Sequence, residues 1–315
     1  MMNKKIHETV LLNESINSLK IKKNGIYFDG TFGCGGHSKE ILKKLGKHGK
    51  LYAIDRDPQS IEIGKKISDP RFYIIHGNFS NIDILLKKYN LKNKIDGMIL
   101  DLGISSLQIM SKKRGFSFYL DGPLDMRMNP NDKISAFKWI NSSNTKDIYY
   151  VLKNFGEERF AKKIAHKISI IKKKKLISTT KELSQIIESI VPRKNKHPAT
   201  KSFQAIRIFI NKELDELNIF LKKSLNFLNH KGKISIISFH SLEDRIVKRF
   251  INKYNKIPNI PVGLPISENQ IKKMYNIKFK NIHRIFPSLK EIKKNIKSRS
   301  AILRTATFKS QNIKK

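Results

Sequence analysis

Residues 26 to 38 read Ile-Tyr-Phe-Asp-Gly-Thr-Phe-Gly-Cys-Gly-Gly-His-Ser and carry the strongest fold signal in the chain. An apolar strand ends in the acid Asp29, a glycine-rich turn follows, and a helical pattern begins after the turn. Glycines in such a turn let the backbone approach a nucleoside-type ligand that a Cβ atom would push away. The stretch therefore predicts a ligand site at the first strand–helix turn of an α/β sheet.

A second apolar strand, residues 51–54, ends in another acid, Asp55. This acid follows Gly35 by about 20 residues, the spacing at which α/β nucleotide folds place a carboxylate on ribose hydroxyls. The spacing supports a nucleotide-type cofactor rather than an ordinary tight turn.

Two more strands are predicted, over residues 71–76 and 95–101. Phe79 follows the first of them, and Asp101 ends the second. Ligands of open parallel sheets bind beyond the carboxyl ends of the strands, where both residues join the two earlier acids. Phe79 fits equally an adenine-contacting ring and a core aromatic.

The turn departs from the dinucleotide fingerprint G-x-G-x-x-G/A, because Ser38 occupies the third glycine position. No P-loop sequence G-x-x-x-x-G-K-[ST] occurs in the chain. What remains is D-x-x-x-G-x-G, with Asp29 beside the turn. An acid there attracts the sulfonium and ammonium groups of S-adenosylmethionine and would repel a pyrophosphate. The pattern favours S-adenosylmethionine over NAD.

Length and composition bound the other possibilities. A chain of 315 residues has room for about two domains. It has no apolar run long enough to span a membrane, and its first seven residues lack the apolar region of a secretory signal. The single cysteine, Cys34, fits a reducing cytosol, so we expect a cytoplasmic protein. The histidines form no Cys/His cluster, and no metal site is expected.

The formal net charge of +38 indicates a polyanionic partner. Most of the 64 basic residues are lysines, which a genome biased toward A and T would add to any solvated face. Part of the charge therefore reflects composition, and nucleic acid remains the favoured partner.

The strand–helix alternation stops near residue 108, and strand character returns only over residues 233–239 and 300–308. We therefore expect a sheet domain built from residues 1–108 and 213–315. The intervening residues 109–212 are expected to form an inserted helical domain that recognises the substrate.

Helical patterns dominate this insert. One helix is expected to begin at Thr145 and to stop at Gly156, and another covers residues 157–172 with an apolar stripe. A capping-box pattern at 179–182 predicts a further helix start. A long amphipathic helix is expected to run continuously from Phe203 through Leu214.

A series of sequence blocks extends from residues 7–12 to 300–304. The blocks between these ends are 29–33, 35–38, 53–58, 100–103, 114–118, 121–128, 156–160, 197–200, 203–205 and 238–245. In these blocks the chain resembles the bacterial 16S rRNA (cytosine-N4) methyltransferase H family, and many blocks in the same order make the resemblance far more specific than any single motif.

The resemblance implies a Rossmann-like class I S-adenosylmethionine-dependent methyltransferase sheet with an inserted all-helical domain. The implied substrate is the exocyclic N4 amine of one decoding-site cytidine in the 16S rRNA of the 30S subunit. DNA and membrane partners are not expected, and a homodimer is compatible with the sequence. The implied cofactor contacts are Gly35, Gly36, His37, Asp55, Phe79, Asp101 and Gln108, of which His37 and Gln108 come from the resemblance alone.

Three positions depart from the family pattern. Cys34 and Lys201 stand where arginine is usual, and the loop before His197 is shortened. The loss of a positive charge at Cys34 is expected to alter cofactor affinity modestly. The shortened loop weakens the expectation that this loop contacts RNA.

The cytosine N4 amine is a weak nucleophile, so an enzyme must align it and accept hydrogen bonds from it. Candidate catalytic groups around the base are Asp101, Asp125, Arg127 and His240, with Glu243 as a further polar group, and His240 fits a helix cap equally well. Candidate aromatics for an extruded base are Phe116, Phe118, Tyr119 and Trp139, each as compatible with the core.

Residues 101–105 lack the N/D-P-P-aromatic run of many amine-methylating DNA enzymes, so the sequence alone does not establish amine chemistry. Two other functions remain open. One is a ribosome-binding module with a vestigial nucleotide site. The other is an NAD-linked oxidoreductase, which Ser38 and the lack of an evident acid–base set disfavour.

Overall fold

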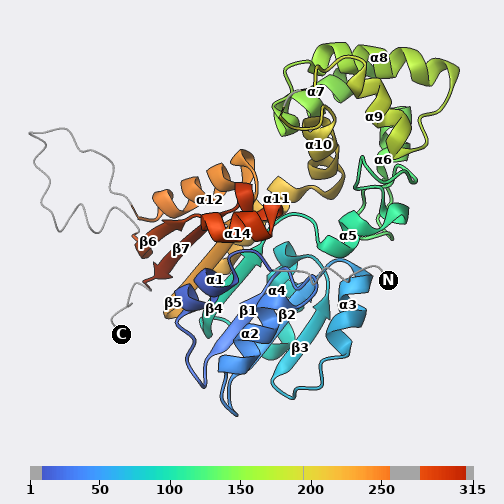
Figure 1. The fold of residues 1–315 in the computed structure, drawn as a ribbon. Coiled ribbons are helices and arrows are strands. Elements are labelled where there is room, and N and C mark those ends of the chain that lie inside the picture. Colours follow the sequence, from blue (N-terminus) through green and yellow to red (C-terminus); the bar gives the residue numbers. More distant parts are fainter. Residues whose placement is uncertain (1–8, 194, 256–276, 310–315) are drawn as a thin grey trace, which may run out of the picture. The chain divides into compact units, whose positions relative to one another are not determined.

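The structure is a computed structural model that describes residues 9–193, 195–255 and 277–309 (Figure 1). His7 and Glu8, at the start of the family resemblance, lie outside the described residues. The chain divides into two compact units. The sheet unit contains the described residues up to Gly103 and from Asp215 onward, and the helical unit is Ile104–Leu214.

The sheet unit is built on a seven-stranded sheet with the order β3-β2-β1-β4-β5-β7-β6 in the described part of the chain. Strands β1 to β5 pair in parallel, and β7 is antiparallel to both of its neighbours. The strands are β1 (Ile26–Asp29), β2 (Lys50–Asp55), β3 (Phe72–His76), β4 (Ile95–Asp101), β5 (Leu228–Ser238), β6 (Phe279–Ile285) and β7 (Ile302–Phe308).

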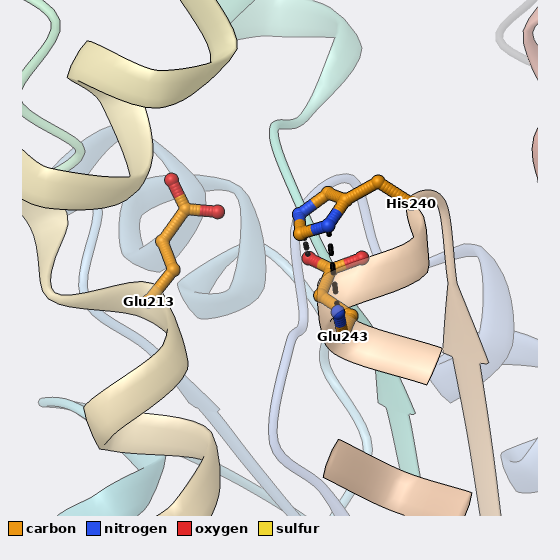
Figure 2. A group of neighbouring side chains, drawn as sticks. All are labelled: Glu213, His240 and Glu243. Carbon is orange, nitrogen blue, oxygen red and sulfur yellow. Dashed lines mark hydrogen bonds and ion pairs between the residues drawn. The ribbon is translucent and has the colours of Figure 1, made fainter. Parts of the chain in front are cut away.

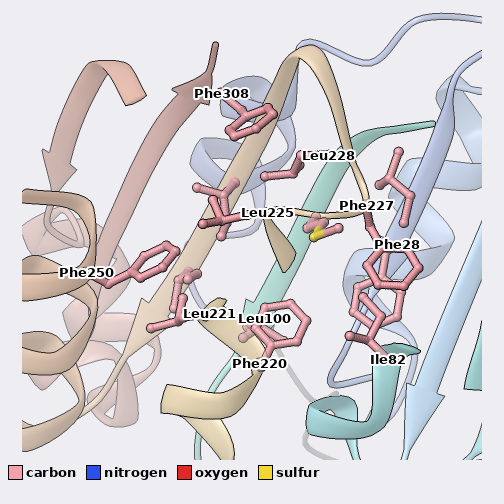
Figure 3. Close-up of a cluster of buried hydrophobic side chains, with 14 of the residues drawn as sticks. Phe28, Ile82, Leu100, Phe220, Leu221, Leu225, Phe227, Leu228, Phe250 and Phe308 are labelled. Atoms are coloured by element: carbon pink, nitrogen blue, oxygen red, sulfur yellow. The ribbon is translucent and has the colours of Figure 1, made fainter. Parts of the chain in front are cut away.

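Helices cover both faces of this sheet (Figure 1). They are α1 (Leu12–Leu19), α2 (Gly36–Lys44), α3 (Pro58–Lys65), α4 (Ile82–Leu85), α11 (Glu213–Ser224), α12 (Ser241–Lys253) and α14 (Leu289–Lys294). The largest apolar cluster lies between the sheet and part of this helical cover, as Figure 3 shows for Phe28, Leu100 and Phe220. The rings of Phe28 and Phe220 stack at a centroid distance of 5.8 Å. This packing fixes the carboxyl ends of β1 and β4.

The helical unit contains α5 (Ser106–Met110), α6 (Ala136–Ser142), α7 (Thr145–Gly156), α8 (Ala161–Lys174), α9 (Thr180–Glu188) and α10 (Thr200–Asn211). Its own core gathers the apolar stripes of these helices, including Ile164 and Ile168 of α8. The capping box of Thr179 and Glu182 is confirmed at the start of α9. Within the described residues, no helix is long and apolar enough to cross a membrane.

The continuous helix expected through Leu214 is wrong. Helix α10 ends at Asn211, because Lys212 adopts the left-handed conformation with φ 51°. The buried Asn211 side chain donates to the Met126 carbonyl and accepts from the Met128 amide, both at 2.7 Å. A long-range anchor of this kind leaves no signal in helical periodicity.

The helix expected to begin at Thr145 and to stop at Gly156 is confirmed as α7. Gly156 is the last residue of α7, and the left-handed residue after the helix is Glu157, with φ 48°. A Cβ atom at Gly156 would lie 2.7 Å from the carbonyl oxygen of Lys201 in α10. The glycine is therefore required for the close approach of α7 and α10.

Gly156→Ala should destabilise the protein by about 1–3 kcal/mol, because the added methyl group meets a backbone carbonyl in a packed core. Chemical denaturation of the variant measures this loss. Gly46→Ala is the control, since its nearest contact would be 3.2 Å, to a Lys23 side-chain atom. A Gly156→Ala variant as stable as the control would contradict the packing argument.

Candidate active site

The glycine turn after β1 depends on backbone conformations that favour glycine. Gly33 and Gly35 have φ values of 55° and 78°. A Cβ atom at Gly35 would lie 2.8 Å from the Phe32 ring, and one at Gly36 would collide with the Thr9 hydroxyl. The turn therefore packs closely against its own neighbours and begins α2 directly behind them.

Asp29, at the end of β1, is committed to this turn. Its side chain accepts a hydrogen bond from the Ser38 hydroxyl at 2.7 Å and from the Thr31 amide at 3.0 Å. The residue is 1% exposed, and burial raises the pKa of its carboxyl to about 6, although the two hydrogen bonds act to lower it. Ser38 thus replaces the third glycine of the dinucleotide pattern with a buried hydroxyl that bonds the strand end.

Asp55, at the end of β2, ties the same turn to the neighbouring strand. One carboxylate oxygen accepts from the Gly33 amide at 2.7 Å and the other from the Asp57 amide at 2.8 Å. The Ser60 side chain also bonds this carboxylate, and burial raises its pKa. A carboxylate offers about four acceptor positions, so roughly one remains for a ribose hydroxyl.

Asp101, at the end of β4, is the least satisfied acid of the site. Its amide donates to the Thr31 hydroxyl at 2.6 Å, and Oδ2 lies 4.0 Å from Nδ1 of His37. Its Oδ1 is buried and has no hydrogen-bond partner among the described residues. Burial, together with the charges of Asp29 and Glu243, raises the pKa of Asp101 to about 8. A buried acceptor of this kind points to a ligand group as its partner.

Phe79 lies just after β3, at the same edge of the sheet. Its ring meets Phe220 edge to face, with a centroid distance of 5.5 Å. The side chain is half-buried against the main apolar cluster. Packing accounts for one side of the ring, and contact with a cofactor remains a proposal for the other.

His240 caps α12, as Figure 2 shows for its pairing with Glu243. Its Nδ1 accepts from the Glu243 amide at 3.4 Å, and its Nε2 lies 3.2 Å from Oε1 of that residue. Glu243 Oε2 accepts from the Phe239 amide at 2.8 Å. The capping interpretation of His240 is therefore confirmed. Glu213, also drawn, pairs with Arg207 inside the helical unit.

Three of the predicted site residues belong to the helical unit. Gln108 is buried, and its side chain completes a capping box with Ser105 at the start of α5. Asp125 and Arg127 form a two-pronged ion pair with distances of 2.8 and 2.6 Å. This pairing raises the pKa of Arg127 and orients both side chains.

The candidate aromatics of the helical unit separate into two kinds. Phe116 and Trp139 are buried in its core. Phe118 stacks on His197 at a centroid distance of 4.4 Å, whereas the Tyr119 side chain is 75% exposed. Exposure leaves Tyr119 the most accessible of the four for a base.

Sequence reasoning missed one residue of the site. Thr31 donates its amide to Asp29 and accepts the Asp101 amide, so it joins β1 to β4. A threonine two residues after a strand-end acid is too common to have been singled out. The mixed sheet with five parallel strands, the glycine turn and the acids at three strand ends define a Rossmann-like class I methyltransferase.

The sequence matches the MraW methylase family over residues 4–309, and the chain belongs to this family. Its cofactor is S-adenosylmethionine. A relative from Buchnera aphidicola subsp. Schizaphis graminum (strain Sg), named "Ribosomal RNA small subunit methyltransferase H", is 57% identical over 98% of this chain and 100% of its own length. A relative of the same name from Buchnera aphidicola subsp. Baizongia pistaciae (strain Bp) is 55% identical, covering 97% and 98%.

The raised pKa of Asp101 should make stability depend on pH. The folded protein keeps a proton that the unfolded chain loses above its ordinary pKa of 3.8, so this residue destabilises the fold increasingly as pH rises toward about 8. Asp101→Asn cannot ionise, and its stability relative to the parent protein should rise between about pH 5 and pH 8. Urea unfolding without cofactor measures this difference.

Asp69→Asn is the matched control, because its pairing with Arg71 lowers the pKa of that acid. Its stability difference should stay constant over the same pH range, in which Asp69 remains ionised in both states. An equally constant difference for Asp101→Asn would show that Asp101 does not titrate in this range.

Proposed function

We propose that the protein methylates the N4 amine of one decoding-site cytidine, position 1402, in the 16S rRNA of the small ribosomal subunit. The observation that carries this proposal is its likeness, over nearly the full length, to relatives named ribosomal RNA small subunit methyltransferase H. The net charge of +38 supports an RNA substrate.

The residues of the sheet unit fit the cofactor. The glycine turn presents backbone without side chains at Gly33 and Gly35, and Asp55 keeps an acceptor position for a ribose hydroxyl. His37 and Gly36 open α2 directly after the turn. We assign cofactor contacts to these residues, to Phe79 and Asp101, and to Gln108 of the helical unit.

Asp101 is the group of the sheet unit best placed to act on the amine. S-adenosylmethionine supplies an electrophilic methyl group when bound. The Oδ1 atom of Asp101 is a buried acceptor, so an N–H of the target amine would satisfy it and be oriented by it. In its ionised form, this carboxylate can also take up the proton that the amine releases, and its raised pKa makes it a stronger base than an ordinary carboxylate.

The other candidate residues have supporting roles in this proposal. His240 and Glu243 fix the start of α12, and the charge of Glu243 helps to raise the pKa of Asp101. Asp125 and Arg127 hold each other in one orientation, which suits a rigid polar contact to the base or its ribose. We assign substrate recognition within the 30S subunit to the helical unit, with Tyr119 as its exposed aromatic side chain.

The proposal is tested by incubating labelled S-adenosylmethionine and the protein with unmodified 30S subunits. We expect one methyl group on N4 of one 16S rRNA cytidine, located by mass spectrometry. Folded protein that binds the cofactor but transfers no methyl group would leave the non-catalytic ribosome-binding function. Tighter binding of NAD than of S-adenosylmethionine would favour an oxidoreductase.

Asp55→Asn should weaken S-adenosylmethionine binding by about 10- to 100-fold, because charge-assisted hydrogen bonds contribute roughly 1.5–3 kcal/mol. Some loss of stability is also expected, since the Gly33 amide bonds this carboxylate. Equilibrium binding well below the unfolding temperature measures the affinity.

Asp96→Asn is the control for this substitution. Asp96 accepts from the Ile26 amide at 3.1 Å and pairs with Lys22, at the amino ends of the strands. It should reduce stability and leave cofactor affinity unchanged. If both variants bound the cofactor like the parent protein, Asp55 would have only a structural role.

A further inference from the structure

The connection between β6 and β7 lies at the same edge of the sheet as the glycine turn after β1. Strand β7 is antiparallel to β5 and to β6, so β5 and β6 point in the same direction. The pairs Ser238↔Ile302 and Ile285↔Leu303 place the end of β6 and the start of β7 beside the carboxyl end of β5. Residues 284–300, which we call the basic connection, therefore begin and end at this edge.

A short segment, residues 9–11, joins the basic connection to the glycine turn. Glu291, in α14, accepts a hydrogen bond from the Leu11 amide at 2.8 Å. Two residues earlier, the Thr9 side chain fills the space beside Gly36. Val10 and Leu11 also share an apolar cluster with Leu303 of β7. Residues 9–11 thus lie between α14 and the turn.

The basic connection is strongly cationic. It carries six Lys or Arg residues and a single acid, Glu291. That acid bonds the Leu11 amide and is only partly exposed, so it offsets little of the outward charge. The six cationic residues are Arg284, Lys290, Lys293, Lys294, Lys297 and Arg299, all exposed.

Three large apolar side chains stand among these cations. Phe286, Leu289 and Ile296 are 55%, 79% and 66% exposed. The Arg284 guanidinium lies over the Phe286 ring at 4.5 Å from its centroid. Protein–protein interfaces are depleted of lysine, whereas surfaces for single-stranded nucleic acid combine cations with exposed aromatic rings. The composition therefore favours RNA over a second protein chain.

We propose that the basic connection binds a single-stranded RNA segment next to the target nucleotide. Its Lys and Arg side chains contact the phosphates, and Phe286 stacks on a base. The identity of the RNA rests on the proposed function, but every residue of this surface belongs to the sheet unit. The sheet unit would then contribute RNA affinity as well as the cofactor site.

Salt dependence tests the phosphate contacts. The test variant combines Lys290→Gln, Lys293→Gln and Arg299→Gln. The logarithm of the affinity for unmodified 30S subunits is plotted against the logarithm of the salt concentration. The steepness of this plot should fall by about 2, because each single-strand phosphate contact contributes roughly 0.7. The control is Lys47→Gln, Lys92→Gln and Lys94→Gln, which removes equal charge from exposed residues before β2 and β4, at the opposite edge. It should keep the parental slope.

Phe286 tests the stacking contact. Phe286→Ala should weaken 30S binding by about 10-fold, the scale of one lost base–aromatic stack. Phe286→Trp should retain the affinity, and Phe286→Leu should behave like the alanine variant. Equal affinities for Phe286→Leu and the parent protein would show that no base stacks here.

Measurements of cofactor binding and of oligomeric state distinguish a lost RNA contact from misfolding and from a lost interface between copies. All variants should bind S-adenosylmethionine like the parent protein, which shows that they are folded. If the parent protein binds 30S subunits and the triple variant keeps the parental slope, the RNA surface is refuted. A shift in sedimentation without a change in RNA binding would instead identify an interface between copies. Absence of methyl transfer by the parent protein would refute the proposed function without touching the binding result.

Discussion

The hydrogen bond from the Gly33 amide to the Asp55 carboxylate holds the active edge of the sheet unit together. It ties the turn after β1 to the end of β2, while Asp29 holds the same turn from β1 through Ser38. Both bonds have an ionisable acceptor, and the first is partly buried and the second buried, a setting in which a hydrogen bond is strong and its loss is costly. A glycine turn with left-handed residues would otherwise sample many conformations.

The same edge gathers acids at the ends of neighbouring strands, and this arrangement opposes stability. Burial raises the pKa of Asp29, Asp55 and Asp101, and like charges raise that of Asp101 further. A cationic cofactor relieves part of this repulsion, because an opposite charge nearby favours the ionised carboxyl group. The same charges that oppose stability at this edge would therefore favour S-adenosylmethionine over a pyrophosphate ligand.

Sequence reasoning reached the parts of the structure that local patterns determine. The glycine turn, the first four strands and the acids that end three of them follow from apolar runs and spacings along a short part of the chain. The capping box at Thr179 and Glu182 is local in the same sense. Strand β6 was missed because a register shift between Lys280 and His283, with Asn281 at φ 50°, interrupts its alternation. The break at Lys212 depends on contacts of Asn211 with residues more than 80 positions away.

Acidic and basic side chains occupy different parts of the edge of the sheet where the parallel strands end. The carboxyl groups at the ends of β1, β2 and β4 lie beside the glycine turn, with Asp29 buried and Asp55 and Asp101 partly buried, and the exposed cations of residues 284–300 lie beyond residues 9–11. A cationic cofactor and an anionic RNA need opposite environments within a short distance, and screening by salt limits how far each field extends. The raised pKa values of Asp29 and Asp101 reduce the negative charge of these acids and therefore their repulsion of phosphate, while exposure keeps the lysines solvated. The contacts of residues 9–11 with Gly36 and Glu291 therefore connect the glycine turn to the RNA surface proposed for residues 284–300.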